Sequence, residues 1–343
     1  MVVAEATERT RSTTPVLSVE DLRVQFHTRR GIVRAVDGVS FTLHRGERFG
    51  LVGESGSGKS TTVLGVMRLV QEPGRITDGS IILHDGDSQV DLAGLSPEEM
   101  RRRRLSDIAL IPQGSMNSLN PVRRIVDHFE DSIRAHERGV RDRDIEARMG
   151  ELLQMVGLKP SVGRLYPHEL SGGMKQRVCI ALSICLSPKV IIADEPTSAL
   201  DVVVQRRVME TLGSVQERLG ASVILVGHDM GLLAQFVDRL GVMYAGKLVE
   251  VGPIRRIFAN PLHPYTRLLI ESLPTLEQRG VFRGVPGLPP SLLNPPGGCL
   301  FAPRCPSRMG ICTQQVPPLV EVEPDHWAAC HLHPEPTRGE VVA

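Results

Sequence analysis

Short apolar runs that end in glycine or acidic residues recur along the chain and predict the strands of a buried sheet. They are "RFGLVGES" at 48–55, "KVIIADEP" at 189–196 and "ASVILVGHD" at 221–229. Continuous apolar runs of this length are typical of parallel strands that are covered on both faces. Longer segments carry apolar residues at helical spacing, namely "TVLGVMRLV" at 62–70, "RDIEARMGELLQMVGL" at 143–158 and "MKQRVCIALSICL" at 174–186. The pattern therefore predicts an α/β fold.

The segment between the first strand and the first helix, "GESGSGKST", has the pattern G-x-x-x-x-G-K-[S/T] of a phosphate-binding P-loop. Its glycines allow a tight turn in which successive amides point inward at a helix N-terminus. Lys59 would reach the β- and γ-phosphates, and the Ser60 hydroxyl would ligate Mg²⁺. The predicted nucleotide ligands in this loop are Gly53, Ser55, Gly56, Gly58, Lys59, Ser60 and Thr61.

Two acids and a histidine stand where the other two predicted strands end. Asp194 and Glu195 follow the second strand, and His228 follows the third. Asp194 would hold the metal through a water, and Glu195 would orient or deprotonate the water that attacks the γ-phosphate. His228 could contact the γ-phosphate from the same sheet edge, although a strand-end histidine alone is more often structural.

The segment "LSGGMKQR" at 170–177 resembles the signature motif of ABC ATPases. The same resemblance makes Gln113 of "IPQ" the Q-loop residue, with a catalytic role and a role in binding Mg²⁺. It makes "SALD" at 198–201 the D-loop and His228 the switch histidine. The resemblance covers about 17–260 and implies a P-loop NTPase core with a helical subdomain at about 113–187. Residues 1–16 are expected to be a flexible N-terminus.

The signature resemblance also implies a head-to-tail dimer. Ser171 and Gly173 stand at the start of a strongly helical segment, which is an anion site of its own. A compact chain cannot place this segment and its own P-loop on one nucleotide, so these residues would close over ATP on the partner chain. Phe26, in "VQFHTRRG", occupies the place where the family commonly stacks an aromatic ring on adenine.

Three further segments narrow the resemblance to the D-type ATP-binding subunit of dipeptide/oligopeptide permeases. They are "SMNSLNP" at 115–121, "NPLHPYTRLLIESLP" from Asn260 and "GLPPSLLNPPGGCLFAPRC" at 287–305. Gly114 and Ser115 depart from the acidic and proline pair that is usual there. The resemblance implies import of di- and oligopeptides with an F-type ATPase partner, two transmembrane permease subunits and, indirectly, an extracytoplasmic peptide-binding protein. Relatives import nickel and other small ligands, and a soluble ABC ATPase outside transport is the competing class.

Charge and hydropathy bear on location and partners. The chain has 40 Lys and Arg against 39 Asp and Glu, so no global field attracts nucleic acid, and we expect no nucleic-acid partner. We find no run of about 18 to 20 apolar residues, the length needed to span a bilayer. The lack of such a run predicts a cytosolic chain, and the resemblance to permease ATP-binding subunits implies a peripheral protein on the cytoplasmic face of the cell membrane.

Four of the six cysteines fall in the last 45 residues, in an expected C-terminal domain at 261–343. Their spacing, C-x₅-C-x₆-C and then seventeen residues, is too open for the paired C-x₂-C knuckles of most structural zinc sites. Thiolates hold Zn²⁺ or a [4Fe–4S] cluster, and unligated thiols are the third alternative. The matching tail of D-type subunits implies a [4Fe–4S] cluster in a small irregular domain, on Cys299, Cys305, Cys312 and Cys330. The other two cysteines, in an apolar run, are expected to be core residues.

Overall fold

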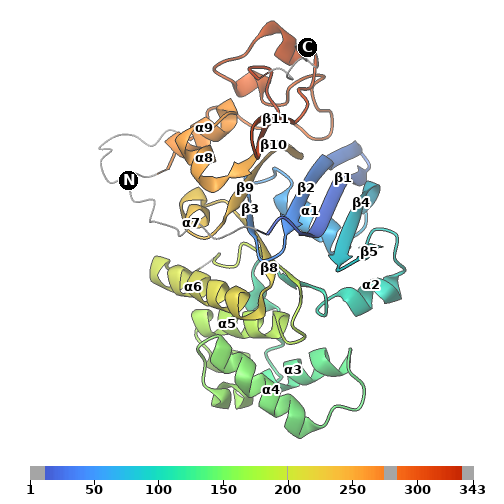
Figure 1. The fold of residues 1–343 in the computed structure, drawn as a ribbon, viewed down its shortest axis with the longest axis vertical. Coiled ribbons are helices and arrows are strands. Elements are labelled where there is room, and N and C mark those ends of the chain that lie inside the picture. The colour runs from blue at the N-terminus through green and yellow to red at the C-terminus, as the bar shows by residue number, and fades with distance from the viewer. Residues whose placement is uncertain (1–11, 199, 274–283, 334–343) are drawn as a thin grey trace, which may run out of the picture.

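The strands of the protein form two sheets (Figure 1). The computed structural model describes residues 12–198, 200–273 and 284–333. Its strands are β1 (Pro15–Thr28), β2 (Gly31–His44), β3 (Arg48–Val52), β4 (Gly74–Asp85), β5 (Ser88–Asp91), β6 (Ile108–Ile111), β7 (Val190–Asp194), β8 (Ser222–Gly227), β9 (Arg239–Tyr244), β10 (Lys247–Pro253), β11 (Val320–Glu323) and β12 (His326–Ala328). An antiparallel sheet has the order β2-β1-β4-β5, and a larger sheet has the order β11-β12-β10-β9-β3-β8-β7-β6.

The centre of the larger sheet is parallel and contains the three predicted strands side by side. β3 pairs with β8, β8 with β7, and β6 and β9 extend this parallel set on either side. Because parallel strands end at one edge of the sheet, the residues that follow β3, β7 and β8 are brought together there. This is the edge on which the sequence places the P-loop, the acidic pair and His228.

The helices cover the sheets and also form a projecting unit. They are α1 (Lys59–Val66), α2 (Pro97–Arg103), α3 (Ile125–Arg134), α4 (Asp142–Met155), α5 (Gly172–Ser183), α6 (Val202–Leu219), α7 (Met230–Ala234), α8 (Ile254–Ala259) and α9 (Pro264–Glu271). Residues 113–187, all of which are described, contain α3, α4, α5 and short 3₁₀ turns but no strand. Figure 1 shows these three helices at the end of the molecule opposite the C-terminal segment.

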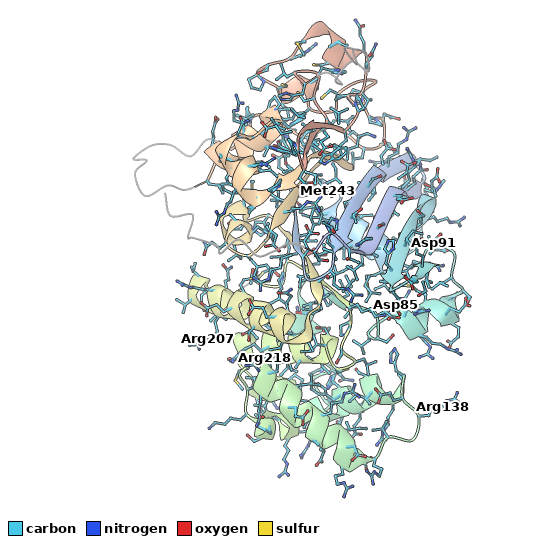
Figure 2. All side chains as sticks on the ribbon, viewed as in Figure 1. Asp85, Asp91, Arg138, Arg207, Arg218 and Met243 are labelled. Atoms are coloured by element: carbon cyan, nitrogen blue, oxygen red, sulfur yellow. The ribbon has the colours of Figure 1, made fainter. Side chains whose placement is uncertain are left out.

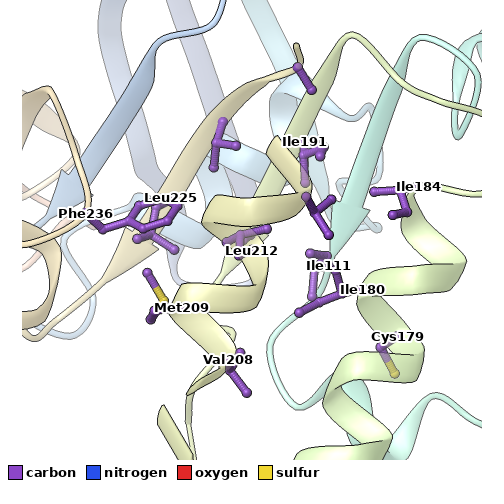
Figure 3. Packing of buried hydrophobic residues seen from close by; sticks show 14 of the residues in the cluster. Ile111, Cys179, Ile180, Ile184, Ile191, Val208, Met209, Leu212, Leu225 and Phe236 are labelled. Carbon is purple, nitrogen blue, oxygen red and sulfur yellow. The ribbon is translucent and has the colours of Figure 1, made fainter. Parts of the chain in front are cut away.

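Two hydrophobic cores lie on the two faces of the larger sheet. Alternate residues of β7 point into each, with Ile191 in the core shared with α5 and α6 and Ile192 in the core shared with β1 and β2. Figure 3 shows the first of these cores, in which Ile191, Leu212 and Cys179 come from different elements. Cys179 and Cys185 are both buried there, so their expected packing role is confirmed.

The C-terminal segment is more ordered than its composition suggests. Irregular turns run through 299–313, as expected, with 3₁₀ turns at Ala302–Arg304 and Gly310–Thr313. The segment then forms β11 and β12, and β12 pairs antiparallel with β10 at the edge of the larger sheet. Its terminal strands therefore complete the core sheet.

Some expectations fall partly outside the described residues. The expected flexible N-terminus at 1–16 is not described as far as residue 11, and β1 already begins at Pro15, two residues before the expected domain boundary. Ala199 of the expected D-loop is also outside the described residues, as are 274–283 and 334–343 of the expected C-terminal domain.

Candidate active site

The P-loop after β3 requires glycine for steric reasons at two of its predicted positions. Gly53 has φ +155°, and a Cβ there would lie 2.2 Å from the carbonyl oxygen of Met243 on β9. Gly58 has φ +102°, and a Cβ there would lie 2.4 Å from the carbonyl oxygen of Ala35. The side chain of Met243, which is labelled in Figure 2, is buried in the core that the larger sheet shares with β1 and β2. The loop is thus packed backbone against backbone, a position that only glycine can occupy without strain.

Lys59, the first residue of α1, lies folded over the centre of this loop. Its Nζ donates to the carbonyl oxygens of Gly53 at 2.7 Å and of Glu54 at 2.9 Å. Burial lowers the pKa of Lys59, while the negative charges of Glu195 and Asp194 act in the opposite direction. The ammonium group therefore sits at the point where a polyphosphate would offer it stronger acceptors than neutral carbonyls.

Ser60 and Asp194 adjoin each other across the sheet edge. The Ser60 hydroxyl donates to Asp194 Oδ1 at 3.2 Å. Burial raises the pKa of Asp194, and the charge of Glu195 adds to this, while the bond from Ser60 and the charge of Lys59 oppose it. A buried carboxylate beside a hydroxyl matches the oxygen ligands that Mg²⁺ prefers, so the residues present fit that ion.

The three predicted catalytic residues meet at one carboxylate. Gln113 Nε2 donates to Glu195 Oε2 at 2.8 Å, and His228 Nδ1 lies 3.3 Å from Glu195 Oε1. Glu195 itself has φ +46°, which is rare for a residue with a side chain and is often found at functional sites. Its side chain is 18 % exposed, whereas that of His228 is 70 % exposed. The contact of Gln113 is with this carboxylate and not with the Ser60–Asp194 pair.

The signature residues lie at the start of α5. Ser171 is the N-cap residue, and its hydroxyl accepts from the Met174 amide at 3.3 Å. Ser171 and Gly172 are exposed, so the first turn of the helix faces solvent. A Cβ on Gly173 would lie 2.8 Å from Val204 Cγ1 of α6, which explains the small residue. The hydrogen bond of Ser171 stays within its own helix, and the role predicted for it on a partner's nucleotide stays a prediction.

Phe26 is half-buried on β1. It pairs with Gly74 of β4, and a Cβ on that glycine would lie 2.6 Å from Phe26 Cε1, so the ring covers Gly74. The contact with Gly74 explains how the Phe26 ring packs within this chain. Stacking of Phe26 on adenine stays a prediction.

Sequence reasoning missed two residues, Tyr265 and Arg304, that hold the P-loop from outside through contacts with Glu54. The carboxylate of Glu54 accepts two hydrogen bonds from the Arg304 guanidinium, from Nη1 at 2.6 Å and from Nη2 at 2.9 Å. The Glu54 amide donates to the Tyr265 hydroxyl at 2.9 Å. Arg304 stands between two of the predicted cluster cysteines, and nothing in the local sequence relates it to a loop 250 residues earlier.

The four C-terminal cysteines are gathered in one region. The Cys299 amide donates to the carbonyl oxygen of Cys312 at 2.8 Å. Burial raises the pKa of the Cys330 thiol to about 11, and the nearby Cys299, Cys305 and Cys312 act in the same direction. Among the described residues, however, no three His, Cys, Asp or Glu side chains are arranged so that they could hold a metal ion. The donors thus suit a thiolate-bound group chemically, but they do not form a ligand cage here.

No helix in the described part of the chain is long and apolar enough to cross a membrane.

Two family models match the chain. The ABC transporter model matches residues 36–198, and the model of the oligopeptide/dipeptide transporter C-terminal region matches residues 249–312. The first match includes the P-loop, the signature segment and the acidic pair. The second includes Tyr265, Arg304 and three of the four cysteines.

Curated relatives match nearly the whole chain. The dipeptide transport ATP-binding protein DppD of Bacillus subtilis (strain 168) is 41 % identical over 332 residues, which cover 96 % of this chain and 98 % of the relative. The oligopeptide transport ATP-binding protein OppD of the same organism is also 41 % identical, over 95 % of this chain and 92 % of the relative. Among solved structures, a dimeric bacterial ABC transporter cassette is 26 % identical with a TM-score of 0.61, covering 70 % of this chain and 99 % of that cassette.

Proposed function

The chain belongs to the ABC transporter family, among its peptide-import ATP-binding proteins, and we propose on this basis that it hydrolyses ATP to power the uptake of di- and oligopeptides through a membrane permease. The observation that carries the proposal is the convergence of Gln113 and His228 on the carboxylate of Glu195, beside the P-loop lysine.

The P-loop residues and Asp194 bind the phosphates and the metal ion. The amides at Gly56, Gly58 and Ser60 surround the phosphates, and Lys59 exchanges its contacts with the loop carbonyls for the β- and γ-phosphates. Mg²⁺, when bound at Ser60 and Asp194, would neutralise phosphate charge during transfer.

Glu195 supplies the base. Its carboxylate orients the attacking water and accepts its proton, which is the work of a general base. Gln113 and His228 fix the two carboxylate oxygens by their contacts at 2.8 and 3.3 Å, so the group is already oriented before the water is bound. His228, being largely exposed, can turn toward the γ-phosphate once nucleotide is present.

The site is completed by a second ATPase chain. The exposed start of α5 presents the Ser171 hydroxyl and the Gly173 amide to an anion outside this chain. A dimeric arrangement of the similar bacterial cassette supports this reading. The partner is an F-type subunit, with ATP held between the P-loop of each chain and the signature segment of the other.

The remaining partners follow from the transport role. The loop after Gln113 and the helical unit of α3 and α4 contact the two transmembrane permease subunits and couple ATP hydrolysis to their conformational change. A peptide-binding protein delivers the substrate outside the cell. The chain works at the cytoplasmic face of the membrane. The peptide-import names of its relatives support this assignment over import of nickel or a role outside transport.

We propose further that the four C-terminal cysteines hold a [4Fe–4S] cluster with a structural role, which requires their thiols to move from the arrangement described above, where they form no ligand cage. The gathering of four thiols supports this, because a cubane cluster requires four cysteine ligands. Anaerobically purified protein should be brown, with about four irons and four sulfides per chain, and Cys305→Ser should bleach it. A colourless protein with one zinc ion per chain would show that the cysteines bind zinc and not the cluster. A metal-free protein that assembles normally would show that the four cysteines are not ligands.

The transport proposal is tested by reconstituting the chain with its permease, its F-type partner and the peptide-binding protein in vesicles. We expect ATP-dependent uptake of a labelled dipeptide, loss of uptake and of ATP binding in Lys59→Ala, and no change in the exposed control Lys159→Ala. Uptake of labelled Ni²⁺ but not of peptide would reassign the substrate. Hydrolysis of ATP by the chain with no binding to any permease would contradict the transport role.

A further inference from the structure

Arg304 reaches from the C-terminal region into the nucleotide-binding loop. The pair that it makes with Glu54 is bidentate, and the Arg304 side chain is 3 % exposed while that of Glu54 is 27 % exposed. Bidentate pairs of this kind fix orientation as well as distance. The contact therefore sets the position of Glu54 and does more than neutralise its charge.

Every donor of the guanidinium has an acceptor. Two bonds go to Glu54, and the other three go to the carbonyl oxygens of Pro286 at 2.7 Å and Val285 at 3.0 Å and to the Tyr244 hydroxyl at 3.2 Å. Arginine carries five N–H groups, so none is left over. A group held at five points cannot shift without breaking several bonds, and this makes Arg304 a rigid anchor for whatever it holds.

Glu54 passes this constraint to the part of the loop that binds phosphate. Its carbonyl oxygen accepts from Lys59 Nζ at 2.9 Å and from the Ser57 amide at 3.1 Å. Its amide is held by the hydroxyl of Tyr265 on α9. The side chain, the amide and the carbonyl of this one residue are thus all engaged, two of them by residues of the C-terminal region.

The same region also borders the outer side of the loop. Pro289, Pro290 and Leu292 line a cavity of about 210 Å³ together with the P-loop segment from Glu54 to Ser57. The carbonyl oxygen of Leu292 accepts from the Arg34 amide at 3.1 Å. The outer side of the loop therefore faces a cavity whose opposite wall is built from residues more than two hundred positions later, and that wall is attached to β2.

We propose that Arg304 is a positioning residue for ATP hydrolysis, which acts through Glu54 to hold the P-loop in its phosphate-binding conformation. The inference rests on the proposed ATPase function and adds that the C-terminal region is part of the nucleotide site. Its competitor is a purely structural role, in which the pair only attaches the C-terminal region to the core.

The test is a double-mutant cycle on the reconstituted transporter, with steady-state KM for MgATP and kcat measured separately. Arg304→Gln should raise KM by about tenfold to a hundredfold, the range expected when a hydrogen bond to a charged group is lost. Glu54→Gln should have a similar effect, and the double variant should be little worse than either one, because both remove the same interaction. Arg304→Lys, which keeps the charge but loses the fork, should fall between wild type and Arg304→Gln.

Two controls separate the proposal from its competitor. Arg308→Gln changes an exposed arginine of the same segment and should leave KM unchanged. Ala328→Gly removes a buried side chain of β12, the strand that attaches the C-terminal region to β10, so under our proposal it lowers the thermal midpoint but leaves KM near the wild-type value.

Additive effects of Arg304→Gln and Glu54→Gln on KM, or an increase in KM with Ala328→Gly as large as with Arg304→Gln, would overturn the positioning role. Wild-type protein that hydrolyses no ATP would instead refute the proposed function, so the two failures are distinguishable.

Discussion

His263 should make the stability of the protein depend on pH. It is 1 % exposed at the start of α9, where its Nδ1 accepts from the Tyr265 amide at 3.0 Å. Burial lowers its pKa to about 4, the charge of His333 adds to this, and the carboxylate of Glu250 on β10 acts in the opposite direction. The folded protein therefore keeps this histidine neutral at pH values where an unfolded chain would protonate it.

The sign and size of the effect follow from this difference. Between pH 6.5 and about 4 the unfolded chain binds the proton and the folded chain does not, so the free energy of unfolding falls as the pH falls through this window. In total, this histidine lowers the free energy of unfolding by about 3 kcal/mol as the pH falls, and about 2 kcal/mol of this decrease occurs between pH 7 and pH 5.

The assay is urea unfolding of the full chain at pH 7 and at pH 5. His263→Asn keeps a side-chain acceptor for the first turn of α9 but cannot titrate. Its free energy of unfolding should therefore fall by about 2 kcal/mol less than that of wild type between pH 7 and pH 5. His27→Asn, at an exposed histidine, should match wild type. Equal losses in wild type and His263→Asn would refute the reasoning, because the buried imidazole would then contribute nothing to the pH dependence.

Three substitutions in the nucleotide site test its other parts. Glu195→Gln should keep ATP binding but lower kcat in the assembled transporter by about 10²- to 10⁴-fold, and unchanged hydrolysis would remove Glu195 from the role of base. Ser171→Arg in this chain alone should leave photo-crosslinkable ATP on its own P-loop while the partner's site fails to close, and equal loss at its own P-loop would contradict the head-to-tail arrangement. Gly53→Ala should abolish nucleotide binding because its Cβ would lie 2.2 Å from the Met243 carbonyl oxygen, whereas wild-type affinity in equilibrium titration would show that the loop can relax.

The parts of the site that the sequence predicts are those fixed by short-range pattern. β3, β7 and β8 are continuous apolar runs, and strands of that kind pair in a parallel sheet whose carboxyl ends share one edge. Lys59, Asp194 and His228 could therefore be expected at one place before any coordinates were known. The contact of Gln113 with Glu195 agrees with the same topology, since β6 is the neighbour of β7.

The parts that sequence reasoning missed depend on long-range packing. β11 and β12 are only four and three residues long, so their strand state is decided by the edge of β10 and not by their own propensity. The ion pair of Arg304 with Glu54 joins residues 250 positions apart, and no local signal relates one to the other. The cysteines are predicted as ligands from their clustering and from the resemblance of the tail to D-type subunits, and neither determines whether four thiols approach closely enough to act as ligands.

The pairing of β12 with β10 also affects how the protein is made. During synthesis β10 emerges long before its neighbour, because Glu250 and His326 are 76 positions apart in the chain. In the folded protein His326 Nε2 lies 2.7 Å from the Glu250 carboxylate. Until the later strand arrives, the nascent chain has an open sheet edge and a buried carboxylate without that contact, and open edges promote adhesion between chains. A chain that stopped at residue 312 would contain every motif of the nucleotide site and still have this edge bare. Premature termination in the last part of the message should therefore give aggregates for proteolysis instead of a truncated ATPase that competes for the permease.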